Sequence, residues 1–213
     1  MIIKEYFQLF VPWLLVTLCI VSVCSWTNLS QFKKGWQKLL VLALSAVITL
    51  TPIGGLSLAD YLLSLNPNFS IGSLALVVVL LWPKFTGRPL LSHKNLRMFC
   101  LWNVVLSLVL FSSYLGFIPY DMYAGGYHFS LWFIIIALIT LMAVWSWNPL
   151  SVIFVAYIAA FNLRLLPSAN FFDYITDGFL LLLSLGLLVL LAASSRLNRS
   201  NTKVASLSVK IIS

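Results

Sequence analysis

Charged side chains are scarce in this sequence. Asp, Glu, Lys and Arg make up 8% of the 213 residues, whereas hydrophobic residues make up 62%. A soluble domain carries roughly a quarter charged residues, because a folded surface in water needs polar cover. The composition therefore excludes an ordinary soluble domain. In hydrocarbon, each apolar segment must be a helix or part of a closed barrel, since every backbone N–H and C=O needs a partner within the protein.

The strict alternation of apolar and polar residues that marks barrel strands is also missing, because the apolar runs here are long and continuous. We therefore predict an all-α polytopic membrane protein, a bundle of about seven transmembrane helices. Residues 1–195 form a single transmembrane helical domain in this prediction, and residues 196–213 form a basic cytoplasmic tail. The expected spans are Tyr6–Trp26, Lys38–Leu50 with a continuation beyond it, Phe69–Trp82, Met98–Phe117, Phe129–Trp147, Pro149–Leu166 and Asp177–Ser195.

Cysteine, histidine and catalytic motifs are few. Cys19, Cys24 and Cys100 lie inside or at the edge of apolar runs without a C-x-x-C pair or metal spacing, so we expect reduced, buried thiols. The sequence contains no phosphate loop, zinc motif, serine triad or haem-binding histidine pair. We predict no cofactor, and an enzyme is a weaker expectation than a non-catalytic protein.

The net charge of +8 does not indicate a nucleic-acid partner, because the basic residues lie in short connections and a tail. With an odd number of spans, eleven of them fall on one side of the membrane, while only Lys4 and Arg164 fall on the other. The positive-inside rule places the first side in the cytoplasm, with the N-terminus outside. The eleven are Lys33, Lys34, Lys38, Lys84, Arg88, Lys94, Arg97, Arg196, Arg199, Lys203 and Lys210.

The aspartates are confined to three outward loops, Leu58–Ser70, Ile118–Phe129 and Leu165–Gly178. Carboxylates near a membrane usually face a cavity or pair with a cation. Several together could bind a metal ion, a proton or a cationic headgroup, and one could act as a general base. We therefore predict an acidic vestibule where the loops meet. Its candidate residues are Asp60, Asp121, Asp173, Asp177, His128, Asn66 and Arg164.

Each aspartate also has a structural alternative. Asp177 precedes an apolar run and suits the N-cap of a helix, and Asp60 completes a capping box with the serine three residues before it. Asp121 suits an Asx-turn. Asp173 lies nine residues from Arg164 in the same loop, so an interfacial ion pair is a further alternative.

Pro52, Gly54 and Gly55 break the second helix after Leu50. The apolar run before them covers only about 18 Å, which is too short to span a bilayer. We therefore expect the helix to continue beyond the break, restarting at Ser57–Asp60. An irregular segment at membrane depth is tolerated where it is buried or lines a cavity, and in transporters it marks substrate sites. The alternative is a proline kink that neighbouring helices heal.

On the opposite side, the basic residues are expected either to contact anionic lipid headgroups or to act only as topology signals. These residues are Lys84, Arg88, Lys94 and Arg97.

Three classes of function follow. The first is a carrier or lipid- or solute-handling protein that works through the vestibule. The second is a non-catalytic subunit or assembly factor of a larger membrane complex, and the third is a membrane-embedded enzyme acting on a lipid-linked substrate at the outer face. The expected partners are membrane lipids and a membrane protein or a second copy of the chain. Short loops and the lack of a targeting sequence favour a bacterial inner membrane.

Overall fold

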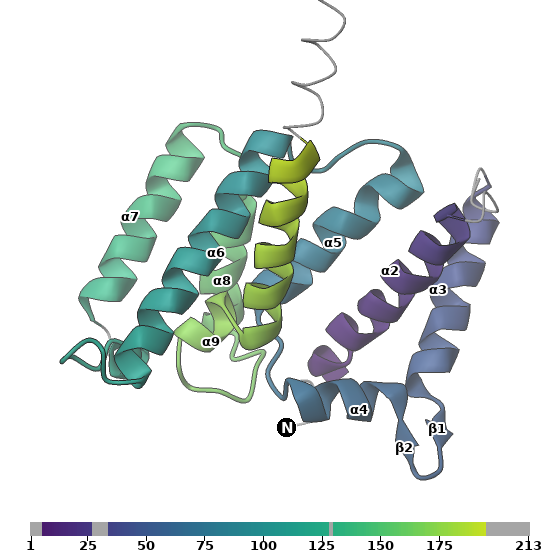
Figure 1. Ribbon diagram of the computed structural model, residues 1–213, viewed down its shortest axis with the longest axis horizontal. Coiled ribbons are helices and arrows are strands. Elements are labelled where there is room, and N and C mark those ends of the chain that lie inside the picture. Colours follow the sequence, from purple (N-terminus) through teal and green to yellow (C-terminus); the bar gives the residue numbers. More distant parts are fainter. Residues whose placement is uncertain (1–5, 27–33, 128–129, 195–213) are drawn as a thin grey trace, which may run out of the picture.

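The computed structural model of the chain describes residues 6–26, 34–127 and 130–194, and most of these residues are helical (Figure 1). The elements are α2 (Phe10–Trp26), α3 (Gly35–Leu50), β1 (Pro52–Ile53), β2 (Leu56–Ser57), α4 (Leu58–Leu65), α5 (Ile71–Thr86), α6 (His93–Tyr114), η1 (Tyr123–Gly126), α7 (Leu131–Trp145), α8 (Leu150–Asn162) and α9 (Phe172–Ile175). A last helix, Gly178–Ser194, follows α9 and has no label in Figure 1. The predicted all-α class is confirmed, and the predicted tail lies outside the described residues.

Two helical stretches are long and apolar enough to cross a membrane, Tyr6–Ser25 with 20 residues and His93–Tyr114 with 22. The other apolar helices are shorter, and α8 has 13 residues. All of them nevertheless run between the same two ends of the molecule (Figure 1). Helix α6 begins five residues before the predicted start at Met98. The reason is that Ser92 caps the helix by accepting a hydrogen bond from the Asn95 N–H (3.2 Å), so a polar first turn precedes the apolar run.

The main core lies between α5, α6, α8, α9 and the last helix. Helix α7 packs against α8 at the edge of this core, and α2 packs against α5 through a second cluster that includes Val11 and Val77. Between α2 and α3, the buried hydroxyls of Thr17 and Ser45 lie 2.7 Å apart. Fully buried members of the main core include Leu76, Phe99, Tyr157, Phe172 and Leu180.

Helix α3 ends at Leu50, and the chain then reverses in a two-stranded hairpin in which Pro52 pairs with Ser57. Gly54 and Gly55 form its tip with φ values of 69° and 100°, a conformation that favours glycine. The predicted capping box is confirmed, since Ser57 and Asp60 exchange side-chain and backbone hydrogen bonds at the start of α4.

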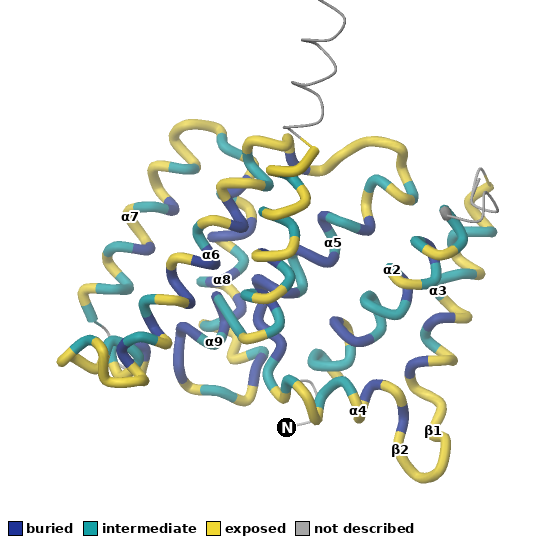
Figure 2. Tube along the Cα trace, viewed as in Figure 1, coloured by how far each residue is buried: buried dark blue, intermediate teal, exposed yellow. Residues whose placement is uncertain are grey.

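The path of the chain after α3 corrects one prediction. We expected α3 to continue along the same span, but α4 turns across the lower ends of α2 and α3 (Figure 1). The hairpin is exposed, with Ile53 78% accessible (Figure 2). Pro52, Gly54 and Gly55 therefore form a turn beyond the end of α3 and not an interruption inside a spanning helix. The two glycines and the proline disfavour a helix locally, and the capping box restarts the helix in a new direction.

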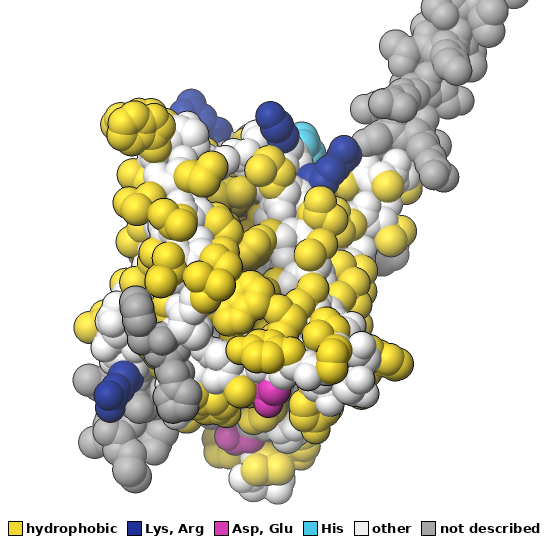
Figure 3. All heavy atoms as spheres, turned by 90° about the vertical axis from the view of Figure 1, so that its left-hand side faces the viewer, with side chains coloured by type: hydrophobic (Ala, Val, Ile, Leu, Met, Phe, Trp, Pro, Cys, Tyr) yellow, Lys and Arg dark blue, Asp and Glu magenta, His cyan; other side chains and the backbone are white. Residues whose placement is uncertain are grey.

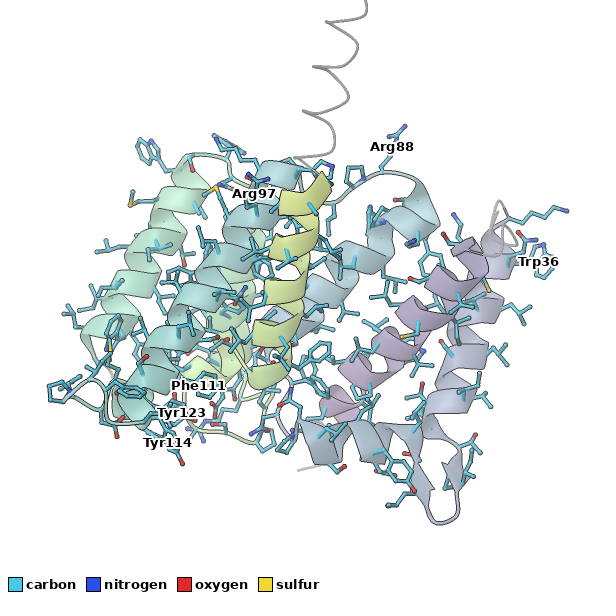
Figure 4. All side chains as sticks on the ribbon, viewed as in Figure 1. Trp36, Arg88, Arg97, Phe111, Tyr114 and Tyr123 are labelled. Atoms are coloured by element: carbon cyan, nitrogen blue, oxygen red, sulfur yellow. The ribbon has the colours of Figure 1, made fainter. Side chains whose placement is uncertain are left out.

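Most of the basic side chains visible in Figure 3 lie at one end of the described structure, whereas the acidic side chains lie at the other end, where one basic side chain is also visible. Arg88 and Arg97 lie at one end, while Tyr114 and Tyr123 lie at the other (Figure 4). The surface between the two ends is largely hydrophobic (Figure 3). We refer to the end that holds Asp60, Asp121, Asp173 and Asp177 as the acidic end.

Candidate functional site

A partly open pocket of about 400 Å³ lies at the acidic end. Three parts of the chain form it: the turn between α4 and α5, the second half of α6 with η1, and the segment from α9 to the start of the last helix. We call it the acidic-end pocket. Its lining residues are Asn66, Pro67, Asn68, Ser107, Leu110, Phe111, Tyr114, Tyr123, Phe172, Asp173, Thr176, Asp177 and Gly178.

Asp177 is held by hydrogen bonds on both carboxylate oxygens. Its Oδ1 accepts from Asn66 Nδ2 (3.0 Å) and from the Leu180 N–H (2.9 Å). Its Oδ2 accepts from the Ser70 N–H (2.7 Å) and from the Ser73 hydroxyl (2.6 Å). A carboxylate offers about four lone-pair positions, so these donors occupy the group. Asp177 thus caps the last helix and ties it to the start of α5, as the structural alternative predicted.

Asp173 has a different environment. Its Oδ1 accepts a hydrogen bond from the Tyr123 hydroxyl at 2.7 Å, and within the described residues it has no hydrogen bond to its second oxygen. Burial raises the pKa of Tyr123 well above its usual value, and the hydrogen bond to Asp173 raises it further. Tyr123 therefore remains a protonated donor, and Asp173 keeps one carboxylate oxygen available at the pocket wall.

A second polar pair lines the pocket, where the hydroxyls of Ser107 on α6 and Thr176 after α9 are 2.6 Å apart. The lining also includes apolar side chains such as Leu110, Phe111 and Phe172. The pocket therefore combines apolar surface with a carboxylate, which suits a ligand with one apolar and one polar part.

The loop that carries η1 and the loop that carries α9 are fastened together by Asn170, a fully buried residue. Asn170 Nδ2 donates to the Tyr123 carbonyl (2.9 Å), and its Oδ1 accepts from the Phe172 N–H (2.9 Å). A Cβ on Gly126 would collide with the Asn170 side chain, so the glycine makes this close approach possible. Tyr123 and Asp173 are positioned by this contact.

No protein-family model, curated protein or solved structure matches this chain. The chemistry of the site therefore has to be argued from its own residues. Among the residues that the structure describes, no group of three His, Cys, Asp or Glu side chains is arranged to hold a metal ion.

The acidic-end pocket brings together Asn66, Asp173 and Asp177 from the predicted vestibule. Asp60 and Asp121 lie at the same end but are not part of its lining. His128 lies outside the described residues, so its position remains a prediction.

Asp60 and Asp121 have local roles. The pKa of Asp60 is lowered, first by the hydrogen bond from the Ser57 hydroxyl and then by the Ser57 backbone N–H. Asp121 accepts a hydrogen bond from the Ala124 N–H at 3.0 Å, three residues on, whereas the predicted Asx-turn would use the N–H two residues on. Asp173 accepts a hydrogen bond from Tyr123, and within the described residues it forms no ion pair with Arg164, so the alternative pairing is not present.

Sequence reasoning did not assign Tyr123, Ser107 or Thr176 to the site. Tyr123 and Asp173 are 50 residues apart, and Ser107 and Thr176 are 69 apart. No local pattern joins such pairs. The available signal was the aromatic residue beside each acidic turn, which the sequence shows at Tyr123.

Four buried polar atoms in the described structure have no hydrogen-bond partner: Trp102 Nε1, Asn103 Oδ1, Tyr157 hydroxyl and Ser184 Oγ. At the opposite end of the molecule, the predicted headgroup-contact residues are all exposed; they are Lys84, Arg88, Lys94 and Arg97.

Proposed function

We propose that the chain is an integral membrane protein that handles a lipid or an amphiphilic solute through the acidic-end pocket. The observation that carries this proposal is the lining of that pocket, in which apolar side chains lie beside the half-occupied carboxylate of Asp173. Such a site accommodates an apolar chain and offers one polar anchor.

The proposed membrane arrangement has seven crossings, formed by α2, α3, α5, α6, α7, α8 and the last helix. The basic end faces the cytoplasm and the acidic end faces outward, in agreement with the positive-inside rule. We place the protein in a bacterial inner membrane. The test is labelling of intact cells with a membrane-impermeant maleimide. Ala169→Cys at the acidic end should react, and Arg88→Cys should react only after lysis; the reverse result would overturn the orientation.

The geometry favours binding from one side over a transport path that crosses the bundle. Every lining residue of the pocket lies toward the acidic end, and the turn at Pro52, Gly54 and Gly55 is not part of the lining. An enzymatic role is less favoured. The carboxylate of Asp177 already accepts four hydrogen bonds, so Asp173 has no second free carboxylate in the pocket with which to divide the general-acid and general-base roles.

A larger side chain introduced at Gly178 would fill part of the pocket without a steric clash. It lines the pocket, and a Cβ built on it would meet nothing within 4 Å. We expect Gly178→Leu to reduce the amphiphile that remains bound after purification in a mild detergent, as measured by native mass spectrometry. Gly186→Leu is the matched control, because Gly186 is also in the last helix and also has open space around its Cβ position. Equal retention by the two variants would contradict the proposal.

A second candidate, a non-catalytic subunit, is favoured by the outer face of α3. Leu40, Leu44 and Val47 are exposed on this helix and recur at helical spacing. The face would fit a helix of another membrane protein as well as lipid. Replacing Leu44 with Trp distinguishes the two: a subunit would lose its partner, whereas a lipid-handling protein would keep its bound amphiphile.

A further inference from the structure

We propose that the acidic-end pocket selects an amphiphile with an ammonium headgroup, with Asp173 as the anion that binds the head. This inference rests on the function proposed above and specifies the chemical class of its ligand. The occupant is the cationic amphiphile itself, with its head at Asp173 and its chain along the apolar wall.

The charge of the pocket points to a cation. Asp173 and Asp177 both line it, while no Lys, Arg or His belongs to its described lining. Asp177 is already occupied by four donors, but Asp173 keeps one carboxylate oxygen without a partner in the described part of the chain. An incoming ammonium group can therefore pair with Asp173 without breaking the hydrogen bond that Tyr123 donates.

Aromatic side chains line the same pocket as this carboxylate. Phe111, Tyr114, Tyr123 and Phe172 all line the pocket, and the first three lie close together near the lower end of α6 in Figure 4. Tyr123 and Phe172 are stacked, with ring centroids 6.5 Å apart and an interplanar angle of 28°. Ring faces attract ammonium groups through their quadrupole, most of all when the cation is only partly hydrated. Carboxylate and rings together favour an alkylammonium head over a neutral or anionic one.

The charge of the rest of the protein makes this preference testable. The chain carries a net charge of +8, so non-specific electrostatics should favour anionic ligands. Preferential binding of a cation would therefore have to arise locally, at the acidic end. Because the ion pair at Asp173 is only partly buried, it should also weaken as the salt concentration rises.

The experiment uses the full chain in phosphatidylcholine nanodiscs and two spin-labelled probes. One probe is a dodecyl chain with a dimethylammonium nitroxide head, and the other is a dodecyl chain with an uncharged nitroxide head. The immobilised fraction in the electron paramagnetic resonance spectrum gives the affinity of each. We expect the cationic probe to bind about tenfold more tightly than the uncharged one.

The variant Asp173→Asn keeps an oxygen that can accept the Tyr123 hydrogen bond and removes the charge. We expect it to lose about tenfold in affinity for the cationic probe and to bind the uncharged probe as before. Asp121→Asn is the matched control, since Asp121 lies at the same end outside the pocket lining. Phe111→Leu keeps an apolar side chain without the ring and should lower the affinity for the cationic probe about threefold.

The outcomes separate this inference from the proposed function. If neither probe is immobilised, both are wrong. If both probes bind equally, or if Asp173→Asn and Asp121→Asn behave alike, the pocket binds amphiphiles but the ammonium assignment is wrong. Tetramethylammonium, which has no chain, is added as a competitor; if it displaces the cationic probe at equal concentration, the ligand is a small soluble cation and the amphiphile assignment is overturned.

Discussion

Replacing Asp177 with Asn tests whether its carboxylate joins α5 to the last helix. Each carboxylate oxygen accepts one backbone N–H, that of Ser70 on Oδ2 (2.7 Å) and that of Leu180 on Oδ1 (2.9 Å). Both residues are fully buried. An asparagine has only one oxygen. Whichever way its amide group is oriented, one of these two N–H groups will face an NH₂ group and lose its acceptor.

The side-chain donors can adapt better than the backbone. The Ser73 hydroxyl can rotate and accept, and the Asn66 amide can reverse. An unsatisfied buried N–H costs about 1–3 kcal/mol, and the remaining bonds lose their charge-assisted strength. We therefore expect Asp177→Asn to lower the free energy of unfolding by about 3 kcal/mol. For a chain of this size, that corresponds to a Tm lower by about 6–12 °C.

The measurement is thermal unfolding in a mild detergent, followed by tryptophan fluorescence. Asp121→Asn is the control, because Asp121 is exposed and, within the described residues, accepts one backbone hydrogen bond, from Ala124, which an asparagine oxygen can also accept. It should change the stability by less than about 0.5 kcal/mol. If the two variants unfold within about 1 °C of each other, the inference that Asp177 is a structural junction is refuted.

Two further pairs of variants test the packing. Among the described residues, the hydroxyl of Tyr157 has no hydrogen-bond partner, whereas that of Tyr174 meets three backbone groups, although both residues are fully buried. In the same unfolding assay, Tyr157→Phe should leave the free energy of unfolding unchanged or raise it by up to about 1 kcal/mol, and Tyr174→Phe should lower it by about 1–3 kcal/mol. Equal effects of the two variants would contradict the assignment of an unpaired and a paired hydroxyl. A Cβ on Gly72 would collide with a backbone carbonyl of α9, whereas one on Gly186 would meet open space. Gly72→Ala should therefore lower the free energy of unfolding by about 1–3 kcal/mol, while Gly186→Ala should leave it unchanged or raise it. A neutral Gly72→Ala would mean that α5 and α9 separate easily.

Most helices could be predicted from the sequence, because continuous apolar runs and capping residues are local signals. The capping box at Ser57 and Asp60 and the N-cap role of Asp177 are both present in the structure. The direction of α4 could not be predicted in this way. Capping chemistry fixes where a helix starts, but its direction depends on the hairpin before it and on contacts with α2 and α3.

The candidate site was predicted only in part. Three of the residues predicted for the vestibule line the acidic-end pocket, namely Asn66, Asp173 and Asp177, and their role in binding stays a prediction. The partner of Asp173 was wrong, since Arg164 is near it in sequence while Tyr123 is brought to it by folding. The sequence also does not distinguish Gly72, at which a Cβ would collide with α9, from Gly186, around which the space is open. Such contacts depend on the rotation of each helix, which composition does not reveal.

In the membrane arrangement proposed above, the short helix α7 at the edge of the molecule and its neighbour α8 have a consequence for the surrounding lipid. Helices α7 and α8 contain 15 and 13 residues, so they extend only about 20–22 Å along their axes, against a hydrocarbon thickness of about 30 Å. Acyl chains next to this edge would have to compress or tilt to match, at a cost of a fraction of a kcal/mol per Å. The protein would therefore partition into thinner regions of a membrane, and its neighbouring lipids would be more strained on the α7 side than beside the long α6.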